Sequence, residues 1–311
     1  MIEVESLTKR YGAATVVDDV SMSVARGSIA VIVGTSGSGK STLLRMINRL
    51  IEPTSGRVLI DGQDTAATPA YLLRRQIGYA IQGHGLFPHR TVTENIATVP
   101  RLLGWDEARI RSRVAELLAI FQLEPAEYAA KFPHQLSGGQ QQRVGVARAL
   151  AAEPAVLLMD EPFGALDPII RGKAQDDLRD IQRRFGTTVV LVTHDMDEAF
   201  RLGDRVGVMS QGRMLQYDRP QVLLTRPADR FVSRLTGTTD RSLRLLSLTS
   251  ALDAVEPGPS DGPTVPGSAS LREVLAELVW RGAAAATVLK ADGTAAGRVT
   301  LAGILARGRA D

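Results

Sequence analysis

The run Gly34-Thr35-Ser36-Gly37-Ser38-Gly39-Lys40-Ser41-Thr42 decides the fold of this chain. An apolar stretch, residues 28–33, precedes it and the apolar residues 43–47 follow it, so the run is predicted to join a strand to a helix. Its spacing is G-x-x-x-x-G-K-[ST], in which glycines let successive backbone N–H groups turn inward around phosphate oxygens at a helix N-terminus. The alternative is a glycine-rich turn without a ligand, which would not require the full spacing.

Each residue of this loop has an expected contact with a nucleotide. Lys40 is expected to reach the β- and γ-phosphates, the Ser41 hydroxyl to ligate Mg²⁺, and Thr42 to donate to an inner phosphate. The rest of the loop is expected to surround the phosphates: Gly34, Ser36, Gly37, Ser38 and Gly39.

Composition narrows the class of protein. A chain of 311 residues with 44% hydrophobic and 23% charged residues is long enough for one large domain and a smaller one. We expect neither a signal peptide nor a membrane span, because no segment approaches the ~20 apolar residues that a span needs. The absence of cysteine fits a reducing cytoplasm. A net charge of +3 does not indicate nucleic acid as a partner.

The segments around the phosphate loop are predicted to be short strands and helices. Strands are expected at residues 2–7, 16–17 and 22–24, with Tyr11 in a polar loop, where it either stacks on adenine or closes a hairpin. After the loop we expect a helix to about residue 50, a strand at 57–60, a helix at 69–76 and a strand at 77–81, followed by Gln82. Leu86 and Phe87 are expected either to dock onto a partner or to tuck into their own domain.

A helical insertion is predicted next, from helices at residues 105–122 and 128–132. It leads into Leu136-Ser137-Gly138-Gly139-Gln140, which opens a helix that runs to about residue 152. Two glycines at a helix start offer backbone N–H groups to an anion. This is a second candidate phosphate site.

Charged residues follow two predicted parallel strands. Asp160 and Glu161 come directly after the strand at 155–159, and His194 follows the strand at 188–193, after a long helix at 168–185. The carboxyl ends of parallel strands meet at one sheet edge. Burying two unpaired carboxylates there is costly, which favours a metal or a water-activating role. A lone histidine is usually structural, but its position at this edge favours catalysis.

The C-terminal part is predicted to hold two strands at 205–210 and 213–217 and a helix at 220–235. On that helix Arg226, Arg230 and Arg234 would form a basic stripe, either a solvated face or a contact for a membrane surface or anion. Residues 256–270 are rich in Pro, Gly, Ser and Asp and are predicted to be a flexible loop or linker. A helix at 271–281, a hairpin of residues 286–289 and 297–300, and a helix from 301 are expected beyond it.

Residues 1–235 resemble the ATPase subunit of an ATP-binding cassette (ABC) transporter, because five separate motifs occur in that family's order and spacing. The resemblance implies an α/β P-loop NTPase fold with a mixed sheet core, an antiparallel β subdomain and a helical subdomain at about 90–152. It makes residues 34–42 the Walker A loop, 136–140 the signature and 155–161 the Walker B strand. It further implies a Q-loop at Gln82, a D-loop at Asp167, a switch histidine at His194 and an adenine-stacking aromatic at Tyr11.

In this family two cassettes pair head to tail, and each ATP lies between the Walker A loop of one chain and the signature of the other. By that resemblance Asp160 positions Mg²⁺, Glu161 polarises the attacking water, and His194 and Lys40 stabilise charge on the γ-phosphate. Gln82 contacts the metal or the water. The signature residues that would bind ATP are Ser137, Gly138, Gly139 and Gln140, with Asp167 linking the two sites.

The resemblance also has implications for the transported substrate and for the C-terminal tail of the chain. Residues 46–56, 74–79 and 85–89 are similar to importers of glycine betaine, proline, choline or carnitine, whereas an importer of another solute such as methionine is the alternative. Residues 248–311, after a connector at 236–247, resemble a single cystathionine-β-synthase (CBS) unit. Thr300 is followed by Leu301, Ala302 and Gly303, not by the Thr-x-x-Asp of adenosine-binding units, so both nucleotide sensing and dimer stabilisation stay open.

Partners and location follow from the resemblance. They are a second cassette, transmembrane permease subunits, indirectly a substrate-binding protein, and the membrane surface. The expected place is the cytoplasmic side of the inner membrane, as a peripheral protein. A cassette protein that acts on DNA or the ribosome is disfavoured, because such proteins usually carry two cassettes or a long coiled coil in one chain.

Overall fold

The computed structural model describes residues 1–81, 85–164, 166–237 and 239–309. The chain divides into two compact units, Met1–Tyr217 and Asp218–Asp311. This division places residues 218–235 with the second unit, whereas the sequence assigned them to the cassette. None of the helices in the described ranges combines the length and apolar character of a membrane span.

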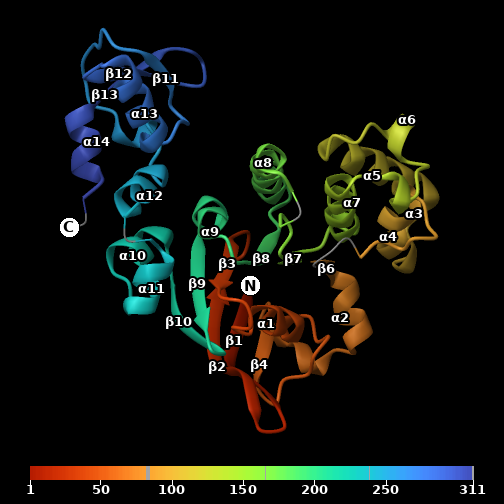
Figure 1. Ribbon diagram of the computed structural model, residues 1–311. Coiled ribbons are helices and arrows are strands. Elements are labelled where there is room, and N and C mark those ends of the chain that lie inside the picture. Colours follow the sequence, from red (N-terminus) through yellow and green to blue (C-terminus); the bar gives the residue numbers. More distant parts are fainter. Residues whose placement is uncertain (82–84, 165, 238, 310–311) are drawn as a thin grey trace. The chain divides into compact units, whose positions relative to one another are not determined.

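A six-stranded sheet forms the centre of the first unit (Figure 1), in the order β10-β9-β3-β8-β7-β6. Its pairs β3/β8, β3/β9, β6/β7 and β7/β8 are parallel, so these strands end at one edge. Three central strands are buried along their whole length, which is typical of parallel strands covered on both faces. The strands are β3 (Ile29–Gly34), β6 (Ile77–Ala80), β7 (Val156–Asp160), β8 (Thr188–Thr193), β9 (Arg205–Ser210) and β10 (Arg213–Asp218).

A four-stranded antiparallel sheet, in the order β2-β1-β4-β5, forms a second layer of this unit. Its strands are β1 (Ile2–Tyr11), β2 (Ala14–Val24), β4 (Ser55–Ile60) and β5 (Gln63–Asp64). The prediction that Tyr11 lies in a loop was wrong. The ladder between β1 and β2 continues through polar residues as far as the Tyr11–Ala14 pair, because backbone pairing in a hairpin does not depend on apolar side chains.

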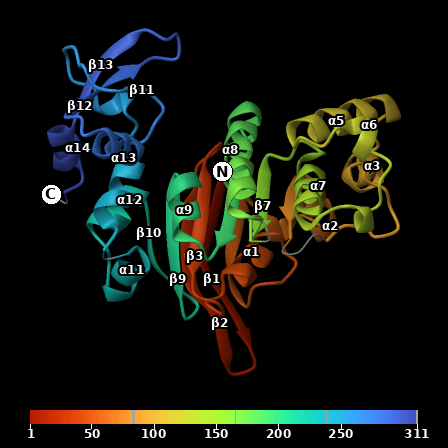
Figure 2. The same ribbon diagram turned by 45° about the horizontal axis from the view of Figure 1, so that its top comes forward.

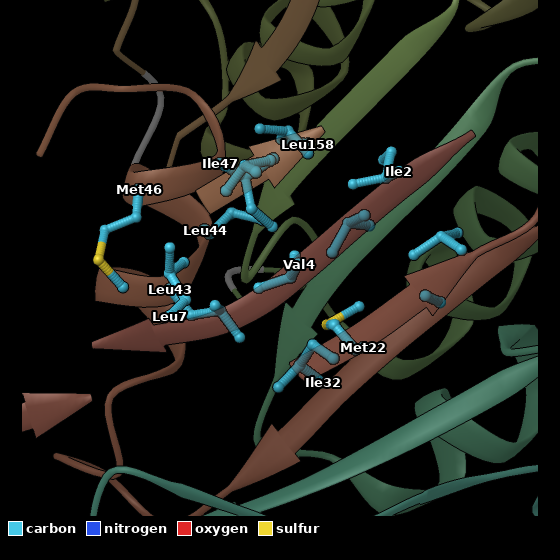
Figure 3. Close-up of a cluster of buried hydrophobic side chains, with 14 of the residues drawn as sticks. Ile2, Val4, Leu7, Met22, Ile32, Leu43, Leu44, Met46, Ile47 and Leu158 are labelled. Carbon is cyan, nitrogen blue, oxygen red and sulfur yellow. The ribbon is translucent and has the colours of Figure 1, made fainter. Parts of the chain in front are cut away.

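The core of the first unit lies between the two sheets and around α1 (Lys40–Ile47), which follows the phosphate loop. Burial of each large apolar side chain there contributes about 1.5–3 kcal/mol, so the packing holds the loop at a fixed place over the sheet. Helices α8 (Pro168–Phe185) and α9 (Met196–Leu202) lie on the opposite side of the six-stranded sheet (Figures 1 and 2). Figure 3 shows the labelled members of this core: Ile2, Val4, Leu7, Met22, Ile32, Leu43, Leu44, Met46, Ile47 and Leu158.

Helices gather at the β6 end of the sheet, next to α2 (Ala70–Gln76) (Figure 1). Between residues 85 and 150 the structure describes helices and no strand, as predicted for the helical subdomain. The helix expected at 128–132 is instead α6, which begins at Pro125 and ends at Tyr128, because proline fits the first position of a helix. The other helices are α3 (Val92–Ile96), α4 (Thr98–Leu102), α5 (Glu107–Ile120) and α7 (Gly138–Leu150).

The second unit has its own core and a three-stranded sheet in the order β11-β12-β13. The helix predicted at 271–281 and the hairpin with the helix after it are confirmed. Its elements are α10 (Pro220–Thr225), α11 (Arg230–Leu235), α12 (Arg241–Ser247), β11 (Thr264–Pro266), α13 (Leu271–Arg281), β12 (Ala285–Leu289), β13 (Ala295–Thr300) and α14 (Leu301–Arg307).

One prediction for this unit was wrong, and another was right only in part. The helix expected at 220–235 is broken at Arg226, which has φ −135° and ψ 64°, because the following Pro227 disfavours helical geometry at the residue before it. The three arginines therefore do not form one helical stripe. Residues 256–270 are mostly loop, as predicted, but the segment is not a free linker: Glu256 pairs with Arg298, and β11 pairs in parallel with β12.

Candidate functional site

Glycine conformations shape the phosphate loop between β3 and α1. Gly39 precedes the helix in the left-handed region, with φ +96°, and a Cβ there would lie 2.5 Å from the carbonyl oxygen of Val16. Gly37 has φ +77°, which also favours glycine. The loop can follow this path only because these positions lack side chains.

Lys40 is fixed within the loop. Its Nζ donates to the carbonyl oxygens of Gly34 at 2.8 Å and Thr35 at 2.9 Å, and to Ser38 Oγ at 3.3 Å. Burial lowers the pKa of Lys40, while the carboxylates of Glu161 and Asp160 act against that shift. A bound anion would therefore meet an ammonium group that is already held at the loop.

Ser41 and Asp160 form a site suited to a divalent cation. Ser41 Oγ donates to Asp160 Oδ1 at 2.8 Å. Asp160 is 1% exposed, and its Oδ2 has no hydrogen-bond partner in the part of the chain that the structure describes. The nearest cation is Arg45 Nη2, at 4.0 Å. Mg²⁺ prefers such oxygen ligands and completes its shell with phosphate and water, so the residues fit this ion.

Within the described ranges no cluster of three or more His, Cys, Asp or Glu residues could hold a metal ion without such help. A cation at Ser41 and Asp160 would therefore depend on oxygens of a bound nucleotide or water. This dependence is the usual arrangement at phosphate-binding loops, where Mg²⁺ has few protein ligands.

Glu161 and His194 lie side by side at the same sheet edge. His194 Nδ1 is 3.3 Å from Glu161 Oε1, and the two side chains are 65% and 26% exposed. The backbone N–H of Glu161 donates to the carbonyl oxygen of Val192 at 2.9 Å, which extends the pairing of β7 with β8. Glu161 has φ +48°, an uncommon conformation for a residue other than glycine and one that clusters at functional sites.

The signature residues form a separate cluster at the start of α7. Ser137 and Gln140 make a capping box, in which Gln140 N donates to Ser137 Oγ at 3.3 Å and Ser137 N to Gln140 Oε1 at 2.8 Å. Gly139 lies against Leu166, because a Cβ there would be 3.1 Å from Leu166 Cδ2. In the described chain, none of the signature residues is hydrogen-bonded to the phosphate loop of the same chain.

Three further predicted positions have distinct surroundings. Tyr11 is 52% exposed, with Lys9 Nζ 4.9 Å from its ring centroid, so its ring is available for stacking. Asp167 Oδ1 accepts the N–H of Ile170 at 3.1 Å, which caps the start of α8. Phe87 is 38% exposed, and Arg90 and Arg148 of its own domain lie 4.8 and 5.7 Å from its ring centroid, so one part of the ring is covered and another is open to a partner. Gln82 lies outside the described residues.

Some residues that the motifs did not identify surround the site. Arg45 approaches Asp160, and Thr193 and Glu198 are buried beside His194. No signal in the sequence singled them out: Glu198 follows Asp195 and Asp197 in an acidic stretch that resembles a solvated helix start.

Comparison with known proteins identifies the family. Residues 17–164 match the family model for ABC transporters. The glycine betaine uptake system ATP-binding protein YehX of Escherichia coli (strain K12) is 49% identical over 298 residues, which cover 96% of each chain. The osmoprotectant import ATP-binding protein OsmV of Salmonella typhimurium is 47% identical over 304 residues, covering 96% of this chain and 79% of that relative.

Solved structures of ABC transporter cassettes are also similar to this chain. The dimeric structure of MJ0796, a bacterial ABC transporter cassette, has a TM-score of 0.65 and 36% identity, and covers 70% of this chain and 98% of its own. A second structure of that cassette, in a post-hydrolysis state bound to ADP and Pi, has a TM-score of 0.65 and 35% identity over the same shares. The chain belongs to the ABC transporter family, as one of its ATP-binding and ATP-hydrolysing subunits.

Proposed function

We propose that this chain energises an importer of an osmoprotectant quaternary amine, such as glycine betaine, choline or carnitine, with proline as a further substrate. The observation that carries this proposal is the 49% identity to a glycine betaine uptake subunit over 96% of both chains. That similarity extends beyond the cassette into the C-terminal tail, where the sequences of cassettes from unrelated transporters are not expected to be similar. An importer of another solute, such as methionine, is the alternative.

We propose that ATP binds with its adenine on Tyr11 and its phosphates in the loop of residues 34–42. Lys40 then exchanges its contacts with loop carbonyl oxygens for contacts with the β- and γ-phosphates. Ser41 and Asp160 would hold Mg²⁺, together with Gln82. The ion supplies charge neutralisation between the β- and γ-phosphates.

Hydrolysis is assigned to the pair at the end of β7 and β8. Glu161 orients the attacking water and accepts its proton, for which a carboxylate that is partly open to solvent is suited. His194, 3.3 Å away, donates to a γ-phosphate oxygen and stabilises the charge that develops there, as Lys40 does from the other side.

A second copy would complete the site. Ser137, Gly138, Gly139 and Gln140 lie at a helix start but have no contact with the phosphate loop of their own chain within the described residues. Their backbone N–H groups and the Ser137 hydroxyl would bind the γ-phosphate held by the partner chain. Asp167, next to Leu166 and hence close to Gly139, would link the two sites.

The remaining partners are transmembrane permease subunits and, through them, a substrate-binding protein. The exposed Phe87 and the cavity of about 230 Å³ lined by Leu50, Tyr79 and Arg148 support a contact with the permease. The chain would then be peripheral at the cytoplasmic side of the inner membrane, near its surface. The second unit would act as a CBS-like element that stabilises the dimer or regulates it.

Reconstitution tests this proposal. The full chain would be assembled with the permease encoded beside it, and ATP hydrolysis would be measured with the binding protein plus glycine betaine, choline or methionine in turn. Stimulation by a quaternary amine alone supports the proposal, whereas stimulation by methionine supports the alternative. A response to neither removes the substrate assignment and leaves the ATPase assignment in place.

A further inference from the structure

The turn that carries His194 is held by a buried side-chain hydroxyl. Thr193 Oγ1 accepts the backbone N–H of Asp195 at 3.1 Å and donates to Glu198 Oε2 at 3.2 Å. Thr193 is 3% and Glu198 5% exposed. His194 lies between Thr193, which carries this hydroxyl, and Asp195, whose N–H the hydroxyl accepts. The hydroxyl therefore joins the residues before and after His194.

The far side of the turn is held separately. Asp195 Oδ1 accepts the N–H groups of Asp197 at 2.9 Å and Glu198 at 3.1 Å, which caps α9. Asp195 Oδ2 lies 3.5 Å from Arg171 Nη1, and Arg171 Nη2 donates to the carbonyl oxygen of Leu166 at 3.0 Å. These contacts fix where α9 begins, but they do not reach the residue before His194. The residue before His194 is held by the pairing of Thr193 with Val33 of β3, and the Thr193 hydroxyl joins that residue to the backbone after His194.

Glu198 is suited to this position as a neutral acid. The charged groups that face it are Asp195 at the start of its own helix, Glu161 after β7 and Arg171 on α8. The pKa of Glu198 is raised to about 8, chiefly by burial and then by the charges of Asp195 and Glu161, while the Thr193 hydrogen bond and Arg171 act in the opposite direction. Its Oε1 has no hydrogen-bond partner among the residues that the structure describes. Ionisation would therefore place a buried charge near the carboxylates of Asp195 and Glu161, compensated only in part by Arg171 and the Thr193 hydroxyl.

We propose that Glu198 is a positioning residue for ATP hydrolysis: by holding the Thr193 hydroxyl it fixes the backbone after His194 against the end of β8 and so holds the imidazole beside Glu161. This inference rests on the catalytic role proposed for His194. A shift of a fraction of an ångström in this turn would change the contact at 3.3 Å between His194 and Glu161. Misplacement of a catalytic group by about 1 Å costs up to roughly a hundredfold in rate.

Kinetics of the full chain, at a concentration that lets cassettes pair, test the proposal. E198A and T193V are expected to lower kcat by about tenfold, with KM for ATP within about twofold, because the phosphate loop is untouched. E198Q is expected to restore kcat at pH 7, since it keeps a neutral acceptor. Above pH 8 the wild-type rate should fall more steeply than that of E198Q. Leu202→Ala, at a fully buried position of the same helix, controls for loss of packing and should not alter the pH profile.

Hydrogen exchange gives a second readout that does not depend on activity. The Asp195 amide is expected to exchange at least about tenfold faster in E198A and T193V than in the wild type and E198Q. Wild-type kcat and wild-type exchange in E198A would overturn the proposal. H194A run in parallel separates the two failures: a normal rate in H194A refutes the role of His194, whereas a slow H194A beside a normal E198A refutes the role of Glu198 alone.

Discussion

Replacement of Glu198 by glutamine should stabilise the first unit, and more so as the pH rises. The pKa of this carboxyl is raised from 4.5 to about 8 in the fold, chiefly by burial. The folded state therefore keeps a proton that the unfolded state releases. The contribution of Glu198 to stability is complete below pH 4.5 and is lost progressively as the pH rises to about 8. Glutamine takes the same space and does not titrate.

The magnitude follows from the size of the shift. Each pH unit in this window changes the free energy of unfolding by about 1.4 kcal/mol per proton. Between pH 5 and pH 7.5 the advantage of E198Q over the wild type should therefore grow by about 3 kcal/mol, as an upper limit that relaxation around the carboxyl reduces. The contributions of other titrating groups to the pH dependence cancel in this difference, because both proteins contain the same groups.

Urea titrations at several pH values measure this difference. The chain has two tryptophans, Trp105 in the first unit and Trp280 in the second, so W280F would leave Trp105 fluorescence as a probe of the first unit. Glu124→Gln, at an exposed position of the same unit, is the matched control and should show an advantage that does not change with pH. An equal advantage of E198Q at pH 5 and pH 7.5 would mean that the folded protein does not keep Glu198 protonated, which would refute the raised pKa of this carboxyl.

Three other outcomes are expected. E161Q should lower turnover at least about hundredfold while ATP still binds, and size-exclusion chromatography with ATP should show a trapped dimer; wild-type turnover would refute its role. Y11A should weaken ATP binding by about 1–3 kcal/mol in calorimetry, with Y11F as the control, and equal affinities would exclude stacking. A chain that ends after Tyr217, where the first unit ends, should keep basal ATP hydrolysis but lose any response to ionic strength, which assays across salt concentrations would detect.

The sequence predicted the central part of the fold because that part depends on local patterns. The phosphate loop has a fixed spacing, and the buried strands that end at Asp160 and Thr193 are continuous apolar runs. Parallel pairing then brought Glu161 and His194 to one edge, as expected. These predictions needed only motif spacing and strand direction.

Other features depend on contacts between distant residues, which no local pattern reveals. The strand β11 lies in a segment rich in proline and glycine, and it exists because β12 offers a paired backbone. The break at Arg226 depends on Pro227 within a stretch that otherwise has helical periodicity. Glu198 was missed because an acidic stretch predicts exposure, whereas the fold buries this one carboxyl.

The carboxyl ends of β7 and β8 hold the residues of the site in different ways, some by backbone hydrogen bonds of the sheet and some by a turn. Asp160 pairs with Val192 in the ladder, and the N–H of Glu161 continues that pairing, so both carboxylates are fixed by backbone hydrogen bonds of the sheet. His194 lies one residue beyond the end of β8, where Thr193 pairs with Val33 of β3. Its distance from Glu161 is therefore set by the turn that Thr193 binds. With the role proposed for His194, small displacements of this turn would change the rate of hydrolysis without disturbing the sheet, so the turn would be a point at which the rate can be controlled.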